Sequence, residues 1–199
     1  MTDQLPIQLI VGLGNPGSKY DRTRHNAGQD WVLEVAQSHG IVMAPEKRFF
    51  GLYGQGMIAD QKVHLLIPTT FMNLSGQSVQ AVCAFYKLDN AELLVAHDEL
   101  DLAPGTARFK QGGGHGGHNG LRDIISKRGG DKSFHRLRLG IGHPGHAKQV
   151  SAYVLKKAPN DEFISTQNAM DSATRYLPEA IKGHWQQAMN SLHSETPHN

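Results

Sequence analysis

Short apolar runs that alternate with helical patterns are the feature that most constrains how this chain can fold. The first run, Leu9-Ile10-Val11, is as short and as uniformly apolar as a strand buried on both faces. A glycine turn and a polar segment follow it, and apolar residues then recur at helical spacing from Ala27 to Gly40. Because strands that alternate with helices pack as a sheet between helical layers, we predict an α/β three-layer sandwich. Its sheet is expected to be twisted, mixed and mostly parallel, with helices on both faces.

The other elements follow from the same two periodicities. We expect strands at 49–59 and 62–68 as a hairpin, at 92–97, at 106–110 on an edge and at 134–141, an acidic turn at 98–101, and helices at 75–87, 121–127 and 161–192, the last broken at Pro178. The sequence has no repeat, no low-complexity linker and no domain boundary. We therefore expect residues 1–199 to form a single domain, with a disordered tail from about 194 to 199.

Composition limits the cellular setting. No segment approaches the ~18 apolar residues of a membrane helix, and the N-terminus lacks a basic stretch followed by an apolar core. The single cysteine, Cys83, cannot form an internal disulfide and falls on a helical core stripe. We expect a cytoplasmic protein in a reducing compartment, without contact to membranes.

Charge is distributed unevenly along the chain. The net charge is only +2, yet residues 107–157 hold 11 of the 20 lysines and arginines and only two acids, Asp123 and Asp131. A basic block on a neutral or acidic body is typical of a protein that binds a polyanion on one face. An ordinary solvated surface would explain the same block.

Gly12, Gly14 and Gly17 have the spacing of a dinucleotide-binding turn and follow a strand. That turn requires a helix to start on the glycines, whereas the polar residues 18–24 delay the helix here by about ten residues. Glu34, the candidate ribose ligand, lies inside the predicted helix rather than after a second strand. The pattern therefore favours a tight turn with close backbone approach, and a nicotinamide site stays an alternative.

Two histidine pairs, His115 with His118 and His143 with His146, have a spacing found in metal sites. Both pairs lie in glycine-rich or proline-containing loops, and no HExxH pattern accompanies them. We expect no metal and no other cofactor, with a zinc site as the alternative.

Polar side chains follow two of the predicted strands. Open α/β sheets bind ligands beyond the carboxyl ends of their strands, which is where Asn15, His25 and Asp98 stand. An aspartate beside a histidine can fix the tautomer of the imidazole and stabilise its charged form. The ordinary alternative is a helix cap or a turn residue at each position. No G-x-S-x-G motif offers a serine nucleophile, so a hydrolase built on these residues would activate water.

Asn15, Asn73 and Asn119 each lie in a turn close to a predicted helix start. Asparagine in such a place is usually a helix cap or a left-handed residue. The functional alternative is that the three amides converge to hold a carbonyl and a water, since an amide both donates and accepts hydrogen bonds.

Several longer motifs resemble those of the bacterial peptidyl-tRNA hydrolase family, in family order and over about residues 7–190. They are Gly12-Leu-Gly-Asn-Pro-Gly17 with Tyr20 and Thr23-Arg-His-Asn26, Pro68-Thr-Thr-Phe-Met-Asn73-Leu-Ser-Gly76, His97-Asp-Glu-Leu-Asp-Leu102, Gly112-Gly-Gly114 with Gly117-His-Asn-Gly-Leu121, and Phe134-His-Arg-Leu-Arg-Leu-Gly-Ile-Gly142. Several motifs in order are far more specific than any one of them. Three positions depart from the pattern, Gln29, Ile67 and Glu99, and Ile67 removes a basic group expected near the site.

The resemblance implies an enzyme that hydrolyses the ester between a peptide and the 3′ end of tRNA, releasing the peptide and reusable tRNA. His25 then matches the general base that activates water, and Asp98 matches the residue that orients it. Asn15 matches the position that separates N-blocked peptidyl-tRNA from free aminoacyl-tRNA. The other implied contacts are Asn73, Asn119 and His118 to the substrate near the ester, Tyr20 and Phe71 to the tRNA 3′ end, and Lys110, Arg138 and Lys148 to tRNA phosphates.

This interpretation also accounts for the larger features of the sequence. The basic block becomes a tRNA footprint, residues 143–158 become a mobile lid, and the protein acts as a monomer on peptidyl-tRNA. An RNA-binding protein without hydrolysis and a nicotinamide oxidoreductase are the alternatives that the structure and the assays must distinguish.

Overall fold

The computed structural model describes residues 4–195 of the chain. Its strands are β1 (Leu9–Gly12), β2 (Ala44–Glu46), β3 (Gly51–Ile58), β4 (Gln61–Pro68), β5 (Leu93–Glu99), β6 (Ala107–Gln111) and β7 (His135–Gly140). Its α-helices are α1 (Ala27–Ser38), α2 (Ser75–Tyr86), α3 (Asn119–Lys127), α4 (Val150–Val154), α5 (Asn160–Ile181) and α6 (Trp185–Ser194). Among the short 3₁₀ turns are η1 (Ser18–Tyr20), η2 (Arg24–Asn26), η4 (Met72–Leu74) and η6 (Ala147–Gln149). Within residues 4–195, no helix combines the length and the apolar character needed to cross a membrane.

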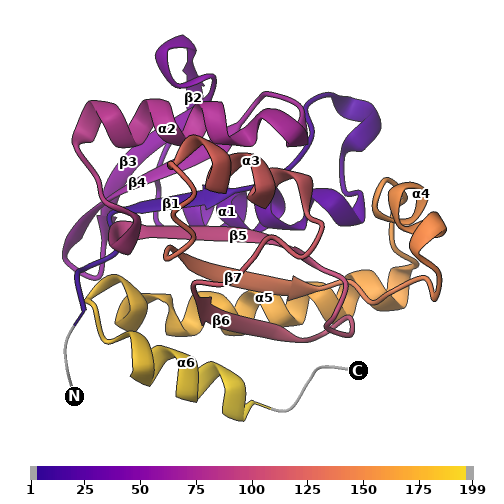
Figure 1. Cartoon of the computed structure of the whole chain (residues 1–199). Coiled ribbons are helices and arrows are strands. Elements are labelled where there is room, and N and C mark those ends of the chain that lie inside the picture. The colour runs from indigo at the N-terminus through magenta and orange to yellow at the C-terminus, as the bar shows by residue number, and fades with distance from the viewer. Residues whose placement is uncertain (1–3, 196–199) are drawn as a thin grey trace.

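One seven-stranded sheet runs through the middle of the molecule in the order β2-β3-β4-β1-β5-β7-β6 (Figure 1). The four central strands, β4, β1, β5 and β7, are mutually parallel. β3 and β6 run against these strands, and β2, which is antiparallel to β3, again shares their direction. Five of the seven strands therefore point the same way, as predicted for a mixed, mostly parallel sheet.

Alternate residues of each strand point to opposite helical layers. Ile10 of β1 packs in the cluster that includes Trp31 of α1 and side chains of α5 and α6. Leu9 and Val11 pack in the other cluster, with side chains of α2 and α3. Cys83 is buried in this second cluster, as its place on a core stripe predicted. The structure thus has the predicted three layers, with α2 and α3 on one face of the sheet and the remaining long helices on the other (Figure 1).

The prediction of an acidic turn at 98–101 is wrong for its first two residues. Asp98 and Glu99 are the last two residues of β5, paired with Leu139 and Gly140 of β7. A parallel neighbour strand extends β5 by two residues, and the sequence of β5 alone does not show where this neighbour ends. The backbone of Asp98 is therefore held in place by its pairing with β7.

The long C-terminal helix is broken at Gly183 and not at Pro178, which lies within α5. Gly183 has a φ of +89°, and a Cβ there would lie 2.2 Å from the carbonyl oxygen of Gln4. The Gln4 N–H donates to the Gly183 carbonyl (3.0 Å). The backbone of Gln4 thus packs so closely against residue 183 that only glycine fits there. α6 then continues to Ser194, so the predicted disordered tail does not begin there, and 196–199 lie outside the described residues.

Gly28 sets the start of α1 directly against the sheet. A Cβ on Gly28 would lie 2.1 Å from the carbonyl oxygen of Ala96 in β5, too close for any side chain. The same carbonyl accepts a hydrogen bond from the Leu13 N–H (3.1 Å), which holds the turn after β1 at this place. Because Ala96 lies two residues before Asp98, this close packing brings the turn η2, with His25, to the end of β5.

Candidate active site

A cleft with a volume of about 520 Å³ lies beyond the carboxyl ends of β1 and β5. Seven of the predicted site residues line it: Asn15, His25, Phe71, Asn73, Asp98, His118 and Asn119. The short helix α4 and the residue after it complete the wall with Val150, Ser151, Val154 and Leu155. The position agrees with the expectation that an open α/β sheet binds its ligand at strand ends.

His25 and Asp98, the two predicted catalytic residues, are hydrogen-bonded to each other. The Nδ1 atom of His25 lies 3.0 Å and 2.9 Å from the two carboxylate oxygens of Asp98. An ionised carboxylate only accepts, so Nδ1 carries a proton and donates it to this bond. In the neutral imidazole Nε2 is then unprotonated, and its lone pair can take a proton from water. His25 is 9% exposed and Asp98 only 4%.

His118 is a second imidazole on the same carboxylate. Its Nδ1 accepts hydrogen bonds from the N–H groups of Gly120 and Leu121 (3.1 and 3.3 Å), which caps the start of α3. An accepting Nδ1 places the proton of the neutral ring on Nε2, which donates to Asp98 Oδ1 (2.8 Å). His118 therefore begins α3 and holds Asp98, in addition to lining the cleft.

Burial and charge act in opposite directions on these groups. Burial disfavours the imidazolium of His25, but the charge of Asp98 and the hydrogen bond to it outweigh this effect and raise the pKa of His25 above its ordinary 6.5. Burial likewise favours a neutral Asp98, but attraction to His25 and His118 and the two hydrogen bonds lower the pKa of Asp98 far below its ordinary 3.8. Asp98 is therefore ionised at neutral pH and stabilises a proton on His25.

Asn15 presents one end of its amide to the cleft. Its Oδ1 accepts a hydrogen bond from the Met72 N–H (2.8 Å). The backbone of Asn15 is held by the side chain of Asn26, which accepts from its N–H (2.8 Å) and donates to its carbonyl (3.0 Å). With Oδ1 engaged by Met72, the amide NH₂ group is the part of Asn15 that faces a ligand. Asn15 therefore presents hydrogen-bond donors to the cleft.

The helix-cap interpretation of the three asparagines is wrong. Leu74 occupies the N-cap of α2 and His118 that of α3, while Asn73 and Asn119 lie beside these positions with their side chains exposed. Asn15 has neither a cap position nor a positive φ. None of the three amides caps a helix, although Oδ1 of Asn119 accepts a hydrogen bond from Arg122 Nη1 (2.8 Å), and all three residues line one cleft.

Two aromatic rings lie at the rim of the cleft. Phe71 is 56% exposed, and the ring of Tyr20 meets it edge-on with a centroid distance of 6.5 Å. Tyr20 comes from η1 and Phe71 from the residue before η4, so the pair joins two loops that are distant in sequence. The exposed ring of Phe71, with the half-buried Tyr20 beside it, offers a face on which a base can stack.

Lys110 and Arg138 lie together in a second cavity, of about 270 Å³, that shares Glu99 and His118 with the cleft. Arg138 donates from Nε to Glu99 Oε1 (2.8 Å), so its charge is partly balanced. Lys148 lies in η6, is exposed, and lines neither cavity. The structure thus brings two of the three predicted phosphate-binding residues together and leaves the third apart.

Two arginines of the basic block have structural partners, although one of them, Arg136, also lines the second cavity. Arg136 is buried and donates to the backbone carbonyls of Gly113 and Gly114. Arg128 is half-buried and donates to Asn90 Oδ1 (2.7 Å). These two arginines hold loops in place, and a count of basic residues along the sequence cannot separate them from arginines that bind a ligand.

The sequence predicted a mobile lid at 143–158 but did not identify the residues of α4 that form this wall of the cleft. Val150, Val154 and Leu155 have the spacing of an apolar helix face, directly after a polar loop, and that signal was available. Glu99, which stood out in the sequence only as a departure from a motif, lines both cavities and binds Arg138.

The other sequence alternatives find little support in the geometry. Within residues 4–195, His25, Asp98 and His118 are the one set of three metal-ligand side chains whose donor atoms lie within 4.8 Å of each other. Hydrogen bonds already join these atoms, and a metal would have to displace their protons. His115 and His143, from the two predicted pairs, each accept a hydrogen bond from a loop N–H two residues further on (3.0 and 2.9 Å).

The glycine turn does not begin a helix. α1 starts at Ala27, well after Gly17, and Glu34 lies inside it, as the sequence predicted. A Cβ on Gly14 would lie 2.6 Å from Oε1 of Gln29, so this glycine makes room for α1 rather than for a ligand. The arrangement lacks the helix N-terminus on which a dinucleotide pyrophosphate binds.

Known proteins of one family are similar to this chain over nearly its whole length. The family model described as peptidyl-tRNA hydrolase matches residues 9–199. A peptidyl-tRNA hydrolase from Saccharophagus degradans is 59% identical over 190 residues, 96% of each chain. Another from Marinomonas sp. is 56% identical over 188 residues, 94% of this chain and 97% of the relative. The crystal structure of peptidyl-tRNA hydrolase from Acinetobacter baumannii superposes with a TM-score of 0.95 at 47% identity and covers 100% of both chains.

Proposed function

This chain belongs to the peptidyl-tRNA hydrolase family and hydrolyses peptidyl-tRNA, and we propose that His25, held by Asp98, is the general base of the reaction. The resemblance predicted from the sequence motifs is confirmed by these relatives, and nothing in them favours an oxidoreductase or a binder without hydrolysis. One observation above all supports the proposed base. His25 Nδ1 lies 2.9 Å from a buried carboxylate, which leaves Nε2 to take a proton in the cleft.

In the proposed reaction a water molecule beside His25 attacks the carbonyl carbon of the ester. His25 Nε2 removes a proton from the water as the new C–O bond forms, and Asp98 stabilises the resulting imidazolium. Amide donors of Asn73 and Asn119 stabilise the negative oxygen of the tetrahedral intermediate. The intermediate then breaks its bond to the ribose oxygen, which takes the proton from His25. The products are the peptide acid and the tRNA hydroxyl.

The test of this proposal is the release of amino acid from N-acetyl-aminoacyl-tRNA and from the same tRNA with a free amino group. We expect rapid release from the blocked substrate and much slower release from the unblocked one. No release from the blocked substrate would overturn the proposed reaction.

We expect Asn15→Asp to lose the preference for blocked substrates. The change keeps an oxygen for the Met72 N–H and replaces the NH₂ donor with a second acceptor. A neutral hydrogen bond is worth about 0.5–1.5 kcal/mol, so kcat/KM on the blocked substrate should fall by roughly tenfold. The ammonium group of the unblocked substrate would meet a carboxylate, so its kcat/KM should fall less.

The measurement is the ratio of kcat/KM for the two substrates. The matched control is Asn73→Asp, which changes a second amide on the same cleft and should lower both values without changing their ratio. An unchanged ratio in Asn15→Asp would contradict the proposed role of Asn15.

We further propose that tRNA lies across both cavities of one monomer. Lys110 and Arg138 would contact phosphates in the second cavity, and Tyr20 and Phe71 would stack on bases of the 3′ end. Support comes from the cavity's position, since it shares His118 with the cleft that holds the proposed base.

We expect the affinity for uncharged tRNA to fall steeply between about 50 and 200 mM salt, because each neutralised phosphate contributes a slope of roughly −0.7 to −0.9 in log K against log salt. Lys110→Gln should make this slope shallower by about one phosphate. The control is Lys132→Gln, which removes an exposed lysine of the same block outside both cavities. Fluorescence anisotropy measures the slopes, and a flat salt response would argue against the phosphate contacts.

A further inference from the structure

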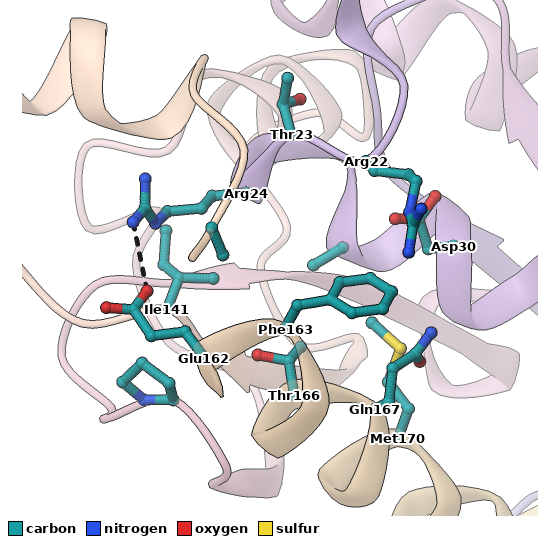
Figure 2. A pocket seen from close by; sticks show the side chains of 13 residues that line it. Arg22, Thr23, Arg24, Asp30, Ile141, Glu162, Phe163, Thr166, Gln167 and Met170 are labelled. Carbon is teal, nitrogen blue, oxygen red and sulfur yellow. Dashed lines mark hydrogen bonds and ion pairs between the residues drawn. The ribbon is translucent and has the colours of Figure 1, made fainter. Parts of the chain in front are cut away.

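We propose that Arg24 is a positioning residue that holds α4 against the cleft, an inference that rests on the function proposed above. Arg24 directly precedes His25 in η2, yet it does not line the cleft, and its side chain lines a different cavity, of about 30 Å³ (Figure 2). The side chain is only 8% exposed. A buried arginine needs partners for its charge, and these partners identify what it does.

The partners of Arg24 come from the two helices that follow β7. Nη2 lies 3.1 Å from Glu162 Oε2 of α5, the contact drawn as a dashed line in Figure 2. Nη1 donates to the backbone carbonyl of Tyr153 in α4 (3.3 Å), and Cζ lies 3.9 Å from the centroid of the Tyr153 ring. The backbone N–H of Arg24 donates to the Lys156 carbonyl (3.0 Å). Arg24 thus joins the turn that carries the proposed base to α4 through its side chain, and to Lys156, two residues after α4, through its backbone.

Few other contacts hold this part of the chain. Between residues 143 and 157, Val154 is the one buried residue. Tyr153 adds a hydrogen bond from its hydroxyl to the Ile141 carbonyl (2.6 Å). A segment with so little buried surface opens at low free-energy cost unless specific contacts hold it. After α4, Lys157 also forms an isolated β-bridge with Thr23. Within α4 itself, the contacts of Arg24 with Tyr153 are a large part of what holds the helix in place.

The contacts of Arg24 should affect substrate binding, because α4 is part of the cleft wall. Val150, Val154 and Leu155 face the cleft, whereas the hydrogen bond between His25 and Asp98 does not involve Arg24. Releasing α4 should weaken substrate binding in the ground state and in the transition state alike. A loss of this uniform kind raises KM and leaves kcat unchanged.

The test compares Arg24→Met with Arg22→Met on N-acetyl-aminoacyl-tRNA. Arg22 lines the same small cavity, but its guanidinium stacks on Phe163 of α5, with 4.2 Å from Cζ to the ring centroid. We expect Arg24→Met to raise KM by about tenfold with kcat within about twofold, since it loses a charged hydrogen bond and a cation–π contact. Arg22→Met should change KM by less than about twofold. The low-pH limb of kcat should stay in place in both variants, because His25 and Asp98 are untouched.

A second variant tests the same contact from the other side. Tyr153→Leu should also raise KM, and the double variant with Arg24→Met should raise KM by less than the product of the two single effects, because both changes remove the same contact between guanidinium and ring. Hydrogen exchange of the amides at 150–157 should become faster in each variant, while exchange in α1 stays slow.

Three results would overturn the inference: a fall in kcat with unchanged KM, effects of the two substitutions that multiply, or unchanged hydrogen exchange at 150–157. If the unmodified protein does not release the blocked amino acid, the proposed function fails, whereas the hydrogen-exchange result still tests the role of Arg24.

Discussion

Replacing His25 with alanine will lower kcat for release of N-acetyl-amino acid from tRNA by about 10²–10⁴-fold, the usual contribution of a positioned general base. The methyl group leaves the attacking water without an acceptor for its proton. The fold should survive, because Asp98 keeps the hydrogen bond from His118 Nε2 and is not left as an unpaired buried charge. KM should change little, since the base acts on the water rather than on the bound tRNA.

Single-turnover kinetics at saturating enzyme measure this loss directly, and circular dichroism with a thermal melt checks the fold. His39→Ala is the matched control. His39 lies at the other end of α1, where its Nδ1 is hydrogen-bonded to the carbonyl of Val35 (2.9 Å). We expect this variant to retain full activity. A folded His25→Ala protein with full activity would end the assignment of His25 as the base.

The strand-end rule predicted the centre of the cleft from sequence because it depends on local features. Asn15 and Asp98 lie at the ends of apolar runs that can be read directly, and parallel strands place such ends at one edge of the sheet. The polar residues that separate the glycine turn from α1 could likewise be recognised in the sequence. What brings His25 to Asp98 is the packing of Gly28 on Ala96, a contact between residues 68 positions apart along the sequence.

The features that could not be predicted depend on contacts between segments that are distant in the sequence. Gly183 ends α5 because Gln4 passes across it, and this could not be known from the helical pattern around Pro178. In the sequence Arg136 cannot be told from a ligand-binding arginine, because its bonds to the carbonyls of a distant loop appear only in the structure. The second role of His118, as a donor to Asp98, likewise depends on a fold-level contact between α3 and β5.

Asp98→Asn should lower kcat by about 10²–10⁴-fold and move the low-pH limb of the activity profile downward. Asp98 raises the pKa of His25, so an uncharged amide should let this pKa fall. The base must be neutral to act, and activity is therefore lost as pH falls through the pKa of His25. A lower pKa keeps His25 neutral at lower pH, yet a weaker base removes the water proton less well. The residual activity should thus persist further into acid while its maximum is reduced.

His118→Ala provides a matched change of opposite sign. His118 donates to Asp98 Oδ1 (2.8 Å) and so competes with His25 for the negative charge of the carboxylate. Without that donor, Asp98 attracts a proton on His25 more strongly, the pKa of His25 rises, and the low-pH limb should move upward. The measurement is kcat/KM of the three proteins from acid to neutral pH on one blocked substrate. If both substitutions move the limb in the same direction, the limb belongs to another group and Asp98 does not tune His25. Opposite shifts would assign the limb to His25 and make Asp98 the carboxylate that sets its pKa.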